Sequence, residues 1–271
     1  AERFIRGGFW RWSLRYLLAP LPVAKREFVL KDVRLFFRDT QQWSQLILLA
    51  VLVVVYLFNI KALPLFRGER VPFFFVTLVA FLNLGLSGFV LASIAARFIF
   101  PAVSLEGRQM WLLRSSPLDL KALLWSKYWV GTIPLLVLAL LLTGLTNVLL
   151  KVAPFMMVVS LVTICALTLA IAAMALGFGA LYPQFETENA AQIPTSFGGL
   201  VFMMATIALL AAVLVVLSRA VYTYVRSAWE GQAVGVTAEM VGLFVVAAAL
   251  CAAATFVPLK LALRKMGSFE F

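Results

Sequence analysis

Long apolar runs without formal charges constrain this chain more than any other feature of its sequence. Six runs contain no Asp, Glu, Lys or Arg, and each approaches or exceeds the roughly 20 residues that a helix needs to cross a hydrocarbon core. The runs are 42–60, 71–96, 128–150, 152–182, 190–218 and 240–259. Because an isolated strand cannot satisfy its backbone in lipid, each run predicts a helix. The fold class is therefore an all-α polytopic membrane protein with six transmembrane helices.

Composition excludes the main soluble classes of protein. Hydrophobic residues make up 63% of the chain and charged residues 13%, against about 45–50% and about 25% in globular domains. The formal charge is +11, but the cations lie between apolar runs, so we expect no nucleic-acid partner. The chain has no His, and Cys165 and Cys251 lie inside apolar runs, so we expect neither a metal site nor catalytic residues.

The distribution of Lys and Arg predicts the orientation in the membrane. With six spans, 17 of the 23 Lys and Arg residues fall on the side that holds both termini. Cytoplasmic loops retain positive charge, so both termini are expected in the cytoplasm. We divide the chain into an N-terminal cytoplasmic or interfacial segment (1–41), a transmembrane domain (42–260) and a cytoplasmic tail (261–271).

The predicted membrane interior has only neutral polar groups, such as Asn147, Ser160 and Thr168. Side chains of this kind usually form hydrogen bonds between helices. Ion-coupled carriers instead place charged residues in their spans. The pattern favours a hydrophobic or amphiphilic cargo, or a subunit whose energy comes from a partner.

Three connections carry further signals. Residues 22–43 predict an amphipathic helix at the membrane surface, which can act as an anchor, a partner contact or both. In the loop after the second span, an apolar ridge around Trp111 is flanked by Glu106, Arg108 and Arg114. This loop fits either a short helix that docks into a groove of another protein or a solvated turn. The segment 219–239 fits an aromatic interfacial belt or a short surface or re-entrant helix.

Three segments resemble the membrane permease subunits of bacterial ATP-binding cassette (ABC) exporters. They are LKDVRLFFRDTQQWSQL (30–46), SLEGRQMWLLRSSPL (104–118) and YPQFETENAAQIPTSFGGL (182–200). The resemblance implies that an interfacial N-terminal helix and a short cytoplasmic coupling helix contact an ATPase. The function implied is export by alternating access from a bacterial plasma membrane, and the uncharged spans favour a hydrophobic or amphiphilic substrate.

The resemblance also assigns roles to individual residues. The implied ATPase-coupling residues are Glu106, Gly107, Arg108, Trp111 and Arg114. Those of the interfacial helix are Lys31, Asp32, Arg34, Arg38 and Asp39. A second cytoplasmic contact would comprise Glu186, Glu188 and Asn189.

The implied partners are two ABC ATPase subunits, a second permease copy or a related permease half, and membrane lipids. The sequence has no GxxxxGK[ST] phosphate loop. We therefore expect a non-catalytic subunit that binds no cofactor itself, with ATP and Mg on the partner ATPase.

Two other functions compete with this one. An energy-independent membrane scaffold or lipid scramblase would share the apolar spans and would not need a coupling helix. An intramembrane enzyme acting on lipids is disfavoured, because the spans contain no His, no carboxylate and no pair of nucleophile and base.

Overall fold

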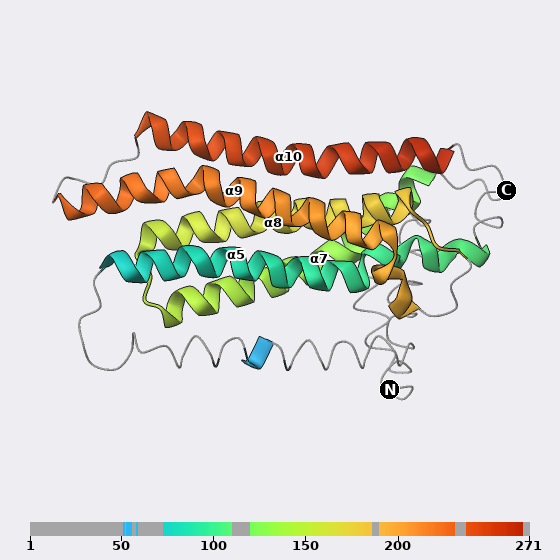
Figure 1. Ribbon diagram of the computed structural model, residues 1–271, viewed down its shortest axis with the longest axis horizontal. Coiled ribbons are helices and arrows are strands. Elements are labelled where there is room, and N and C mark those ends of the chain that lie inside the picture. Colours follow the sequence, from blue (N-terminus) through green and yellow to red (C-terminus); the bar gives the residue numbers. More distant parts are fainter. Residues whose placement is uncertain are drawn as a thin grey trace, which may run out of the picture.

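The computed structural model describes residues 51, 53–55, 58, 73–109, 120–185, 190–230 and 237–267. Within these ranges all regular elements are helical and no strand is present. The long helices are α5 (Phe73–Phe98), α7 (Leu120–Leu149), α8 (Pro154–Leu181), α9 (Phe197–Trp229) and α10 (Ala238–Gly267). The short 3-10 helices are η2 (Phe100–Ala102), η3 (Ser104–Gln109) and η4 (Ala190–Thr195). The long helices run side by side (Figure 1).

The helical membrane fold predicted from the apolar runs is confirmed. In the described part of the chain, five helices are long and apolar enough to cross a membrane. They coincide with the second to sixth predicted spans. The first predicted span, 42–60, is described only at residues 51, 53–55 and 58, which are helical. The predicted interfacial helix, 22–43, lies outside the described residues.

Several helix boundaries differ from the edges of the apolar runs. The run 190–218 is divided, because η4 precedes α9 and Ser196 caps the new helix by accepting a hydrogen bond from the Gly199 N–H at 3.4 Å. At its other end α9 continues to Trp229. Within the predicted segment 219–239, residues 219–229 are therefore the end of a long helix and not a separate surface helix. Helix α10 likewise extends to Gly267, into the segment expected to be a tail.

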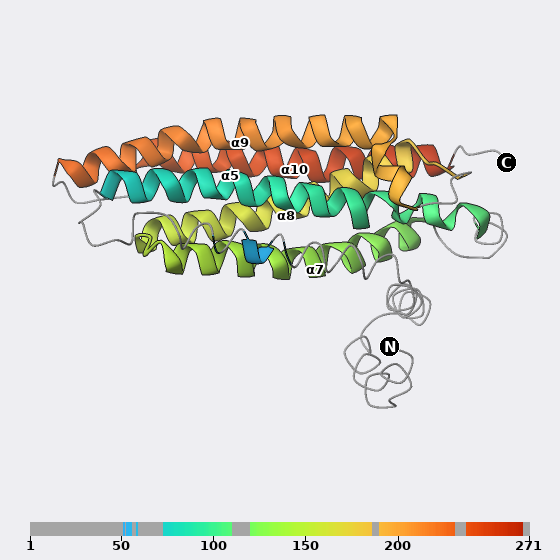
Figure 2. The same ribbon diagram turned by 60° about the horizontal axis from the view of Figure 1, so that its bottom comes forward.

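Helix α8 is the centre of the bundle. It contacts each of the other four long helices, and it lies between them in both views (Figure 2). Its second half is rich in buried alanine and glycine, and small side chains let neighbouring helices approach closely. A β-carbon on Gly177 would lie 2.9 Å from the Pro258 carbonyl carbon of α10, and one on Gly179 would lie 2.1 Å from the Phe100 carbonyl oxygen. Both neighbours are backbone atoms, so the absence of a side chain fixes how α10 and η2 pack on α8.

Candidate functional site

The candidate site is at the end of the bundle where the loop after α5 packs against three other helices. We call this region the junction and define it as η2, η3, the first turns of α7, residues 181–185 and the last turns of α10. The chain passes from α5 into η2 and η3 with little interruption. Phe100 of η2 is fully buried, and its ring lies 5.9 Å from that of Phe202 in α9. Together with the close approach to Gly179, this contact fixes η2 against α8 and α9.

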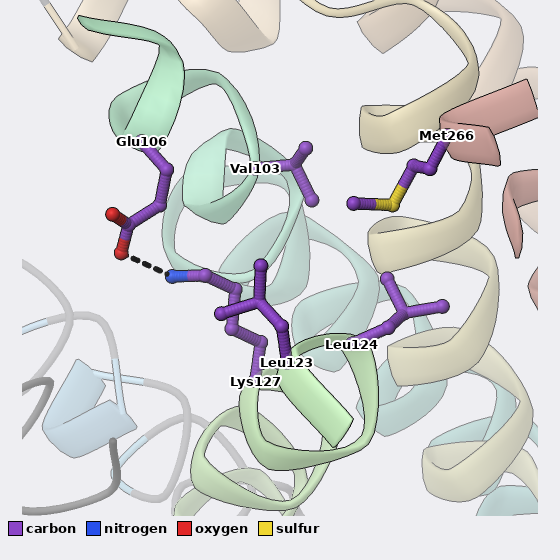
Figure 3. A pocket seen from close by; sticks show the side chains of 6 residues that line it. All are labelled: Val103, Glu106, Leu123, Leu124, Lys127 and Met266. Atoms are coloured by element: carbon purple, nitrogen blue, oxygen red, sulfur yellow. Dashed lines mark hydrogen bonds and ion pairs between the residues drawn. The ribbon is translucent and has the colours of Figure 1, made fainter. Parts of the chain in front are cut away.

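A buried ion pair joins η3 to α7. The Lys127 Nζ donates to the Glu106 Oε1 at 2.9 Å, and the two side chains are only 8% and 7% exposed. Figure 3 shows both side chains converging from their separate elements. The surrounding side chains are Val103, Leu123, Leu124 and Met266. An apolar wall weakens screening by water, and breaking a buried ion pair by removing one partner typically costs about 3–5 kcal/mol.

The space around this ion pair is packed. The space between the six residues of Figure 3 has no room for a water molecule. It therefore offers no cavity for a ligand, and its contacts serve to hold η3, α7 and α10 together. Among the residues that the structure describes, no group of three or more His, Cys, Asp or Glu side chains gathers in a way that would hold a metal ion.

The connection that follows α8 also packs on η3. The Gln184 N–H donates to the Ser104 Oγ at 3.1 Å. A β-carbon on Gly107 would lie 2.4 Å from Phe185 Cδ1, so the Phe185 ring occupies the space that a side chain at position 107 would need. These contacts bring two loops together that are about 80 residues apart in the sequence.

The end of α10 is attached to the same region. The Lys265 Nζ donates to the Leu181 carbonyl oxygen and lies 5.5 Å from the centroid of the Tyr182 ring. The Tyr182 ring in turn meets Phe197, at the start of α9, edge to face. The last turns of α8 and α10 and the first turn of α9 are therefore joined by direct side-chain contacts.

The structure describes only part of the site predicted from the sequence. Glu106 and Gly107 lie in η3, as does Arg108, whose side chain is outside the described set. The other predicted coupling residues, Trp111 and Arg114, lie outside the described residues. So do Lys31, Asp32, Arg34, Arg38 and Asp39 of the predicted interfacial helix, and Glu186, Glu188 and Asn189 of the second predicted contact.

Sequence reasoning missed the partners of the described residues. Lys127 and Lys265 are basic residues beside apolar runs of the sequence, a pattern typical of membrane anchors, yet both bond inside the protein. The Ser104 hydroxyl accepts a bond from the Gln184 backbone, a partner that no pattern in the sequence indicated.

Comparisons with known proteins place the chain in a wider group. A model of the family described as "Putative ATP-binding cassette" matches residues 9–271. Neither the curated proteins nor the solved structures yielded a match.

The family match corrects one prediction from the sequence. We expected a non-catalytic subunit, not an enzyme, because the chain lacks a GxxxxGK[ST] motif. The matching family is described as an ATP-binding cassette, which is a nucleotide-binding type of protein. That prediction is therefore wrong. It rested on one short motif, whereas the match extends over nearly the whole chain.

Proposed function

Since the chain belongs to this ATP-binding cassette family, we propose that its helices form the membrane permease of an ABC exporter. The family and the five apolar helices make the chain an ABC transporter-related membrane protein. The proposal adds that the bundle moves substrate by alternating access and that ABC ATPase subunits drive this motion. ATP and Mg would act at those ATPase subunits.

The observation that carries the proposal is the construction of the junction. A short segment between two apolar helices is fixed by Phe100 on one side and by the Glu106–Lys127 pair on the other. Within η3, Leu105 is 51% exposed while Glu106 is buried. Such a segment presents an outer face to a partner and transmits force through an inner face, as a coupling helix must.

The proposed contact with the ATPase has three parts. The first is the coupling segment, in which Glu106 holds the backbone in place while neighbouring side chains meet the partner. The second part is the interfacial helix around Arg34. The third part is the second cytoplasmic contact, around Glu188. The residues assigned to the three parts are those that the resemblance implies: Glu106, Gly107, Arg108, Trp111 and Arg114, then Lys31, Asp32, Arg34, Arg38 and Asp39, then Glu186, Glu188 and Asn189.

The chemistry of the bundle favours a hydrophobic or amphiphilic substrate. No charged residue occurs in α8 or between Phe197 and Ser218 of α9, so a charged cargo would meet no compensating group along these helices. In the proposed mechanism the substrate pathway lies between two helical bundles. We therefore propose that the chain pairs with a second copy of itself or with a related permease half. The excess of Lys and Arg at the junction side supports a bacterial plasma-membrane protein with cytoplasmic termini.

Affinity purification from native membranes in mild detergent tests the proposal. We expect an ABC ATPase subunit to co-purify, and a photoreactive ATP analogue shows which polypeptide binds nucleotide. Leu105→Ala is expected to weaken ATPase recovery, because it removes an exposed apolar contact from η3. Leu145→Ala is the matched control, since Leu145 is 46% exposed near the opposite end of α7, outside the junction.

Two results would contradict the proposal. If no ATPase subunit is recovered under conditions that keep other membrane complexes intact, an energy-independent scaffold or lipid scramblase becomes the better explanation. If the ATP analogue labels this chain and no other polypeptide, ATP does not act at a partner subunit.

A further inference from the structure

The Glu106–Lys127 pair lies where force from a partner would have to enter the bundle. Glu106 belongs to η3, whereas Lys127 lies about two turns inside α7 rather than at its end. Between η3 and α7 the chain runs through residues 110–119, so the covalent path is ten residues long. The ion pair shortens this path to one contact of 2.9 Å.

We propose that the Glu106–Lys127 pair is the positioning element that makes η3 and α7 move as one body. Displacement of η3 by the ATPase is then delivered to α7 directly and is not absorbed by the longer covalent path. This inference rests on the proposed permease function and assigns positioning roles to two residues. Glu106 acts through Lys127 and does not itself contact the ATPase.

The surroundings of the pair favour this role over a purely stabilising one. An apolar pair of similar volume often gives equal or greater stability than a buried ion pair, so stability alone does not require charges here. An ion pair is directional, and Val103, Leu124 and Met266 line the same packed space beside it. The charges therefore define one relative position of η3 and α7.

The connection that follows α8 moves with η3 and α7 in this proposal. Gln184 is bonded to Ser104, and Phe185 covers Gly107, so η3 cannot shift without displacing residues 184–185. Through Lys265, the end of α10 is bonded to Leu181. A push on either loop would therefore reach α7 and α8 together.

The test measures movement at the far end of α7. Spin labels at Val148→Cys in α7 and Tyr222→Cys in α9 are placed on exposed positions, in a background carrying Cys165→Ala and Cys251→Ala. The complex with its co-purified ATPase is reconstituted into lipid nanodiscs, and the distance between the labels is measured before and after trapping with ADP and vanadate. In the protein with the intact Glu106–Lys127 ion pair, we expect the distance between the labels to change on trapping.

Four changes separate a positioning role from a structural one. Glu106→Gln and Lys127→Met each break the pair, and their combination removes both charges so that no unpaired charge remains. In complexes that retain bound ATPase, all three are expected to lose the shift. The exchanged pair, Glu106→Lys with Lys127→Glu, is expected to restore it. Glu239→Gln is the control, because it breaks the exposed Arg219–Glu239 pair and should leave the shift intact.

The outcomes distinguish failure of the inference from failure of the proposed function. If the double variant Glu106→Gln with Lys127→Met shifts like the wild type, the pair only stabilises the fold and the inference is wrong. If the exchanged pair assembles but shows no shift, a directional ion pair is not what couples η3 to α7. If the wild-type protein binds no ATPase or shows no shift, the proposed function fails and the inference fails with it.

Discussion

Neutral polar side chains inside the helices form hydrogen bonds in two different ways. The Asn147 Nδ2 of α7 donates to the Ser160 Oγ of α8 at 2.6 Å, which joins two helices. By contrast, Thr168 and Thr206 donate to carbonyl oxygens four residues earlier in their own helices. Both arrangements satisfy a buried hydroxyl or amide where water is absent. From the sequence, we expected all neutral polar residues of the spans to form hydrogen bonds between helices. The sequence alone does not show which face of a helix meets a neighbour.

The Asn147–Ser160 bond is expected to contribute measurably to stability. In a double-mutant cycle of Asn147→Leu and Ser160→Ala, we expect a coupling free energy of about 0.6–1.7 kcal/mol, the range of bonds between membrane helices. Reversible unfolding in mixed micelles gives the four free energies of unfolding. Replacing Ser160→Ala with Thr206→Val in the cycle should give no coupling, because the Thr206 hydroxyl bonds within α9. A coupling free energy near zero for both cycles would show that the Asn147 bond adds nothing.

At the scale of whole elements, the packing of α8 against its neighbours depends on glycine. A β-carbon at Gly177 would come within 2.6 Å of the Pro258 side chain and 3.0 Å of its carbonyl oxygen. Since Pro258 lies inside α10, relief would require movement of helix backbone. Gly144 of α7 has no such neighbour within 4 Å.

Gly177→Ala is therefore expected to destabilise the bundle, and Gly144→Ala is not. Overpacking of a close contact typically costs about 1–3 kcal/mol, whereas alanine at an unobstructed helix position is neutral or stabilising by up to about 1 kcal/mol. Thermal unfolding of both variants in the same detergent measures the difference. Equal midpoints for the two variants would mean that α8 and α10 do not approach as closely as the structure shows.

The elements also show where prediction from sequence succeeds and where it fails. Uncharged apolar runs require no partner to be recognised, so the five described spans were predicted to within several residues at most ends. The start of α9 depended on the Ser196 cap, which no apolar run reveals. The Glu106–Lys127 pair could not be predicted, because it requires knowing that η3 folds back beside the second turn of α7. Tertiary proximity, rather than local pattern, decides such contacts.

At the scale of the whole bundle, the described helices carry many exposed apolar side chains. Val137 and Leu141 of α7, Val162 of α8 and Val215 of α9 are each more than half exposed. In water a surface of this kind would aggregate, but it matches the hydrocarbon core of a bilayer. The described bundle therefore has a lipid-facing surface around a core centred on α8.

The length of α9 allows the orientation of the bundle to be tested. Its 33 residues span about 50 Å, which exceeds the roughly 30 Å of a hydrocarbon core. Gln192, before the helix, and Glu230, after it, are both exposed. We expect each to lie in water, on opposite sides of the membrane, with Gln192 on the cytoplasmic side.

Single cysteines at these positions, in a background with Cys165→Ala and Cys251→Ala, test this expectation with a membrane-impermeant maleimide. Glu230→Cys should be labelled in intact spheroplasts, and Gln192→Cys should be labelled in inverted membrane vesicles. Each change removes at most a surface ion pair, which contributes less than about 1 kcal/mol, so neither should disturb the fold. The reversed pattern would place the junction on the outer side, where no ATP-driven partner could reach η3. Labelling of both positions from one side would show that α9 does not cross the membrane.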